Sequence, residues 1–170
     1  MRDNAIRVVT GLLLAVAAGH APAAPLPGAA AAPPGGADPA GRAQLDAAGL
    51  SYEIDADGDF KLVYELDGDR SQVVYVRSAV EPWGGLRVRE ILSPGYRAEG
   101  PDIPCRVALR MLEHGGRARL GGWVRDGRIG IFVVKLDADT PGDRLVDAIE
   151  FAAHAADELE REFTGSKDEF

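Results

Sequence analysis

The sequence predicts an α+β fold in which a single antiparallel sheet of five to six strands carries helices on one face. Three observations lead to this fold class. Short alternating segments follow one another across Asp- and Gly-rich turns, a second pair of such segments flanks Asp126-Gly127, and a long apolar stripe at helical spacing runs through the C-terminal region. The predicted order is a weak helix, four strands, a helix, two strands and a final helix.

The four N-terminal strands are predicted from their alternation and from the turns between them. LSYEID and FKLVYEL flank Asp57-Gly58, QVVYVRSAV follows DGDRS, and LRVREIL follows EPWGG. Because each connection is short and rich in Asp or Gly, consecutive hairpins are the economical interpretation.

Two further helices are predicted after residue 104. Thr140 and Pro141 open the last one, Gly165 closes it, and its apolar stripe comprises Leu145, Ile149, Ala152, Ala156, Leu159 and Phe163. The segment CRVALRMLEH forms the earlier one, with Cys105, Ala108, Leu109 and Leu112 as the expected apolar face and Cys105 as a buried, inert thiol. The weak first helix is expected within RAQLDAAGL.

The N-terminal region has the layout of a secretory signal peptide. Arg2 and Arg7 precede the apolar run VVTGLLLAVAAG and an Ala-Pro-Ala cleavage pattern, so residues 1–23 are assigned to the signal. The apolar run is shorter than the roughly 20 residues that a membrane span needs. Residues 24–41 form an Ala/Pro/Gly-rich linker and residues 42–170 form the domain. We therefore expect a periplasmic or secreted protein without stable membrane insertion after cleavage.

The net charge of −8 is concentrated at the C-terminal end. Residues 42–136 contain fourteen Lys or Arg and fourteen Asp or Glu, whereas residues 137–170 contain three and eleven. An acidic chain of this kind repels nucleic acid and anionic lipid, which argues against both as partners.

The acid-rich stretch SYEIDADGDF invites comparison with a calcium loop. With Gly58 at position 6 of an EF-hand, Glu53, Asp55 and Asp57 occupy positions 1, 3 and 5, but Tyr64 falls where the bidentate glutamate is required. The stretch is therefore interpreted as a hairpin turn. The histidines, His20, His114 and His154, form no zinc pattern, and we expect no catalytic residue, metal site or cofactor.

Four residues are candidates for contact with a partner. Trp83 lies at a predicted hairpin tip, where an aromatic side chain is exposed, and Trp123 either anchors a partner or packs against the sheet. Arg119 and Arg125 belong to a group of arginines around the second hairpin, which either pairs with the acidic last helix or lies on a solvated strand face.

Two stretches of the chain resemble the YbjN family. LDAAGLSYEIDADGDFKLVYEL is similar to the opening of such domains, and the segment from LGGWVRDG to the C-terminal GSKDEF is similar to their closing hairpin and helix. The resemblance implies a fold like that of type III secretion chaperones, a usually dimeric state, and a protein-binding or regulatory role of the kind given to sensory transduction regulators. It carries over no catalytic residue.

Together these observations predict a non-enzymatic periplasmic protein that binds a polypeptide or regulates one, as a homodimer. The alternative is a sensor of a small molecule or an ion, which would use the acidic turns or a pocket beneath the sheet.

Overall fold

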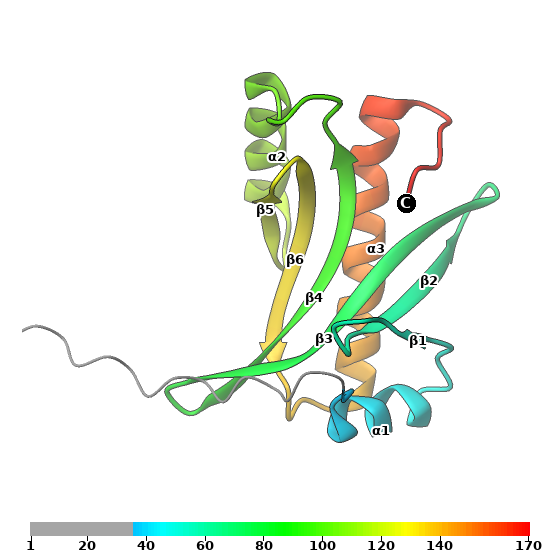
Figure 1. The fold of residues 1–170 in the computed structure, drawn as a ribbon, viewed down its shortest axis with the longest axis vertical. Coiled ribbons are helices and arrows are strands. Elements are labelled where there is room, and N and C mark those ends of the chain that lie inside the picture. Colours follow the sequence, from blue (N-terminus) through cyan, green and yellow to red (C-terminus); the bar gives the residue numbers. More distant parts are fainter. Residues whose placement is uncertain (1–35) are drawn as a thin grey trace, which may run out of the picture.

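The computed structural model describes residues 36–170, so the expected signal peptide and most of the expected linker lie outside the described residues. One antiparallel sheet of six strands, in the order β1-β2-β3-β4-β6-β5, carries the helices, and this confirms the predicted fold class (Figure 1). The strands are β1 (Glu53–Ile54), β2 (Phe60–Leu66), β3 (Arg70–Trp83), β4 (Leu86–Arg97), β5 (Gly122–Asp126) and β6 (Ile129–Asp137). The helices are α1 (Pro39–Ala47), α2 (Cys105–Arg117) and α3 (Gly142–Thr164).

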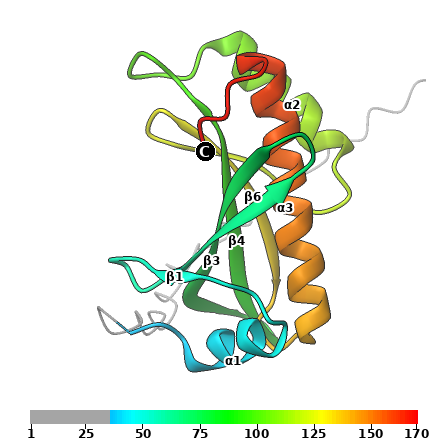
Figure 2. The same ribbon diagram turned by 90° about the vertical axis from the view of Figure 1, so that its right-hand side faces the viewer.

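Helices α2 and α3 lie on the same side of the sheet, as the edge-on view in Figure 2 shows. Alternate residues of the central strands point toward α3 and are buried there, including Val74, Val76, Ile91, Phe132 and Val134. The predicted stripe of α3 supplies the facing surface, with Leu145, Ile149, Ala152, Ala156 and Leu159 all buried. This apolar interface forms the core of the domain.

The ordered fold begins before Arg42, the residue at which the sequence places the start of the domain. Helix α1 starts at Pro39, and Asp38 caps it by accepting a hydrogen bond from the Gly41 amide at 2.6 Å. The same Asp38 carboxylate pairs with the buried Arg89 of β4 at 2.6 Å. Residues 38–41, which composition alone assigns to the linker, are therefore part of the packed domain.

The packed face of α2 differs from the expected one. Val107, Met111 and His114 are buried, and Val107 and Met111 cluster with Leu159 of α3. The expected face points outward instead: Leu109 and Leu112 are 54% and 67% exposed, and Cys105 is exposed as well. Because Val107 and Met111 belong to the same continuous apolar arc of α2 as Leu109 and Leu112, spacing alone did not select the part of the arc that meets the rest of the fold.

Helix α3 approaches β4 closely at Gly95. A Cβ atom added to Gly95 would lie 2.7 Å from the backbone oxygen of Ala156 and 2.7 Å from the Trp123 ring. The register of β4 against β6 shifts between Pro94 and Tyr96, which is the position of a β-bulge. The absence of a side chain at Gly95 therefore lets α3 pack against β4 at this position.

No helix within residues 36–170 is long and apolar enough to span a membrane.

Candidate functional site

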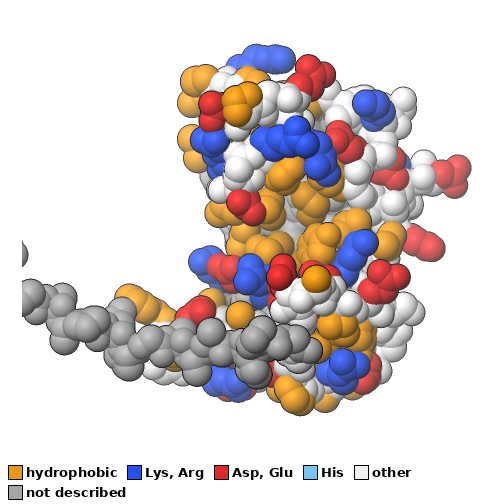
Figure 3. Space-filling model, viewed as in Figure 1, with side chains coloured by type: hydrophobic (Ala, Val, Ile, Leu, Met, Phe, Trp, Pro, Cys, Tyr) orange, Lys and Arg blue, Asp and Glu red, His pale blue; other side chains and the backbone are white. Residues whose placement is uncertain are grey.

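The face of the sheet opposite α3 is apolar, and no helix of residues 36–170 covers it. We call it the open sheet face and define it by the side chains that alternate with the core residues, namely Val63, Val73, Tyr75, Leu92, Pro94, Val124, Ile131 and Val133. Figure 3 views the molecule from this side and shows hydrophobic side chains gathered in the middle of the face, with charged side chains around them.

Strand pairing makes the open sheet face continuous. Tyr75 pairs with Leu92, Leu92 pairs with Val133, and a second row joins Pro94, Ile131 and Val124. Most of these side chains are half-buried by their neighbours, while Val63 and Val124 at the two sides are 62% and 46% exposed. A continuous apolar surface that crosses a sheet from β2 to β5 is the kind of surface that proteins use for contact with other polypeptides.

A second apolar surface runs along α2. We call it the α2 outer stripe and define it by Cys105, Leu109 and Leu112, which follow one another at helical spacing and are all exposed. The expectation that Cys105 is a buried thiol is therefore wrong. It is the first residue of the helix, and the turn that follows it buries Val107 instead.

The two tryptophans have different environments. Trp83 ends β3 at the hairpin tip and is 69% exposed, in agreement with its predicted position. Trp123 lies on the helix side of β5, where its ring packs edge-on against Phe132 at 5.4 Å between centroids. Its indole N–H donates to Nδ1 of His114 at 3.0 Å. Of the two alternatives for Trp123, the structure shows the packed sheet aromatic.

The arginines around the second hairpin do not pair with α3. Arg125 binds Asp102 at 2.6 Å and donates from Nε to the carbonyl oxygen of Gly127 at 2.6 Å. Arg119 is exposed and lines a cavity between α2 and α3, together with His114, His154 and Glu158. The structure therefore separates Arg119 from Arg125, and it places Trp83 at a third location.

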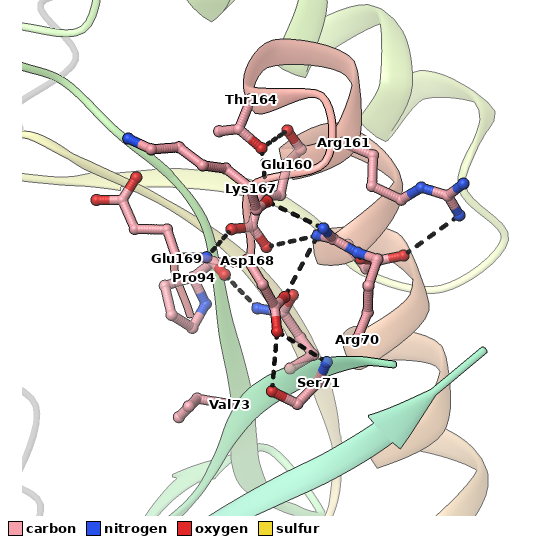
Figure 4. A network of polar contacts seen from close by, with 12 residues as sticks. Arg70, Ser71, Val73, Pro94, Glu160, Arg161, Thr164, Lys167, Asp168 and Glu169 are labelled. Carbon is pink, nitrogen blue, oxygen red and sulfur yellow. Dashed lines mark hydrogen bonds and ion pairs between the residues drawn. The ribbon is translucent and has the colours of Figure 1, made fainter. Parts of the chain in front are cut away.

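Two acids of α3, Asp157 and Glu160, are instead engaged by Arg70 of β3, a residue that the sequence analysis did not single out. Its Nε lies 2.5 Å from Oδ1 of Asp157, and its Nη2 lies 3.2 Å from Oε2 of Glu160 and 3.5 Å from Oδ1 of Asp168. Its Nη1 donates to the Lys167 carbonyl at 2.9 Å (Figure 4). Arg70 thus joins β3, α3 and the C-terminal tail, residues 165–170.

Glu160 is the most deeply buried carboxylate of this group, with no exposed side-chain surface. Burial raises its pKa above the ordinary value of 4.5, although the amide of Glu169, which donates at 2.6 Å, and the charge of Arg70 oppose the shift. The carboxylates of Asp157, Glu160 and Asp168 share the single guanidinium of Arg70. The positive charge of Arg70 therefore only partly balances the negative charge of Glu160.

The acidic turn of the opening hairpin has a structural role. The Asp55 carboxylate accepts hydrogen bonds from the amides of Asp57 and Asp59 at 3.0 and 2.9 Å, and Gly58 has a positive φ of 84°. Asp59 accepts from the Ser78 amide at 2.7 Å and pairs with Arg77 at 2.9 Å. Two of the carboxylates are thus occupied by donors of the protein itself, as suits a turn that links β1 to β2.

No group of three or more His, Cys, Asp or Glu residues in the described part of the chain has a geometry that could hold a metal ion. Neither a family model nor a curated protein matches the chain.

Proposed function

We propose that this chain is a non-enzymatic, exported binding protein that holds an extended or partly folded polypeptide on its open sheet face. The observation that carries the proposal is the continuous apolar surface from Val63 to Val124, which has no helix over it within residues 36–170. A sheet that is apolar on both faces is normally covered on both faces. A stable exported protein that leaves such a face uncovered is therefore suited to bind a partner there.

The charged side chains beside the open sheet face support a polypeptide as the occupant. Lys135 and Glu90 form an ion pair of 2.8 Å across β6 and β4, and Lys61 and Arg77 lie on the same side of the sheet. An apolar centre with mixed charges at its margin is the usual anatomy of a protein–protein contact.

We further propose that the protein is a homodimer and that the α2 outer stripe forms the contact between the two copies. Leu109 and Leu112 are among the most exposed large apolar side chains of the described residues and belong to one helix face. Two such helices packed against each other would bury these leucines, which stabilises association by about 1.5–3 kcal/mol for each fully buried side chain. The open sheet face lies on other elements and stays available in this arrangement.

A photo-reactive amino acid at Tyr75 tests the proposed function, because this position lies in the middle of the open sheet face. The proposal requires that it cross-links to a separate polypeptide in the exported fraction of producing cells. Failure to cross-link any polypeptide contradicts the proposal.

A further inference from the structure

A large cavity of about 750 Å³ lies at the end of the domain where the C-terminal tail returns to the sheet. Its walls come from the end of β4, the loop before α2, the turn between β5 and β6, the end of α3 and the tail. The residues that matter for its chemistry are Tyr96, Arg97, Arg106, Arg128, Phe163 and Lys167. It is separate from both the open sheet face and the α2 outer stripe.

The cavity concentrates positive charge in a chain whose net charge is −8. Arg106, Arg128 and Lys167 border it, and within residues 36–170 none of their side chains has a carboxylate within ion-pair distance. Two of the acids in its wall are already paired, Glu169 with Arg97 at 2.8 Å and Asp102 with Arg125 at 2.6 Å. Of the acids that the described residues place in the wall, only Glu99 remains to balance the three cations.

The position of Lys167 is fixed by the buried cluster around Arg70. Arg70 holds the Lys167 carbonyl, and Glu160 holds the Glu169 amide, so the tail is anchored on both sides of Asp168. Figure 4 shows the Lys167 side chain extending away from Arg70. The packing of the domain therefore fixes the backbone at Lys167 beside the cavity.

An apolar patch accompanies the cations. The rings of Tyr96 and Phe163 meet edge-on at 5.4 Å between centroids, and both line the cavity. A ligand with a charged group and an organic part would place the charge against the cations and the organic part against these rings.

We propose that this cavity binds a small molecule that carries a phosphate or diphosphate group. Three exposed cations without carboxylate partners are suited to a ligand with at least two negative charges, and two of them are guanidinium groups, whose planar donors match the oxygens of a phosphate. Such a ligand would also neutralise the repulsion among the cations, and its binding would stabilise the folded protein by an amount that grows with the logarithm of the free ligand concentration once this exceeds Kd.

Calorimetric titration of the full-length protein with inorganic pyrophosphate at matched ionic strength tests this inference. Binding is expected for the wild type, and the double variant Arg106→Gln/Arg128→Gln is expected to weaken it at least about ten-fold, since each guanidinium contributes a charged hydrogen bond. The control Arg117→Gln/Arg144→Gln removes two exposed arginines that lie outside the cavity and form no ion pair within residues 36–170, with the same change in net charge.

Absence of pyrophosphate binding to the wild type overturns the inference, and so does equal weakening by the control variant. Citrate provides a third arm, because it carries similar charge on carboxylates; citrate binding as tight as that of pyrophosphate would overturn the assignment to phosphate. Thermal unfolding of both variants verifies that each is folded before titration.

Discussion

Arg70 and Asp157, 87 residues apart in the chain, form the closest ion pair of the domain core, with 2.5 Å between Nε and Oδ1 and only 9% of each side chain exposed. This pair connects the sheet to the long helix and, through the other donors of the same guanidinium, to the C-terminal tail.

Replacement of Arg70 by Met is expected to destabilise the domain strongly. Among the described residues it removes the only cation that contacts Glu160 and leaves Asp157 with Arg161 alone at 3.9 Å, so two buried carboxylates lose their main partner. Loss of one member of a buried pair costs about 3–5 kcal/mol, measured as the free energy of unfolding in urea. Arg87→Met is the matched control, because the Arg87–Asp139 pair of 2.6 Å is exposed and contributes about 0–1 kcal/mol. Similar losses for the two variants would contradict this account.

Glu160 is expected to make the stability depend on pH. Because burial raises its pKa in the folded state, the folded protein binds the proton more readily than the unfolded chain does. Its contribution to stability is therefore present below the ordinary pKa of 4.5 and is lost as the pH rises through the raised pKa. The variant Glu160→Gln lacks this loss, so its stability relative to the wild type should increase with pH across that window. A difference that stays constant from acidic to neutral pH would show that the pKa is not raised.

Gly95→Ala is expected to destabilise the contact between α3 and β4. The added Cβ would meet the backbone oxygen of Ala156 at 2.7 Å, and backbone cannot move aside as a flexible side chain can. Overpacking of this kind costs about 1–3 kcal/mol in unfolding free energy. Gly116→Ala in α2 serves as the control: nothing lies within 4 Å of its added Cβ, and the helix should gain up to about 1 kcal/mol. Opposite signs for the two variants are thus the expected result.

The paired variant Leu109→Glu/Leu112→Glu is expected to convert a homodimer into a monomer without unfolding it, since both leucines are exposed in the single chain. Light scattering coupled to size exclusion measures the mass, and circular dichroism verifies the fold. Leu86→Glu, at a residue that is 50% exposed on β4, should leave the mass unchanged. A wild-type protein that is monomeric at micromolar concentration would refute the proposed dimer.

Local patterns were sufficient to predict the elements of this fold. The hairpin at Asp57-Gly58, the exposed Trp83 and the stripe of α3 all depend on residues that are near one another in the chain. The packed face of α2 was predicted wrongly because its apolar residues form one wide arc, and only contact with Leu159 and Trp123 distinguishes the buried part of that arc from the exposed part.

The sites that depend on distant residues were not predicted. The role of Arg70 could not be predicted from a local pattern, because its partners Asp157, Glu160 and Asp168 follow about 90 residues later in the chain. The open sheet face did leave a signal: Val73, Val74, Tyr75 and Val76 form an unbroken apolar run, which is typical of a strand with two covered faces. An alternating strand with one solvated face would have carried polar residues at positions 73 and 75.

The most direct test of the central claim is photo-cross-linking from Tyr75 in the full-length protein inside producing cells. Tyr75 suits a benzoylphenylalanine probe, because it is an aromatic residue, half-buried on the open sheet face and paired with Leu92. The control places the probe at Arg144, an exposed position on α3. The account predicts an adduct with a separate polypeptide from position 75 that is absent from position 144. An adduct of two copies of this chain, or equal labelling from both positions, would contradict it.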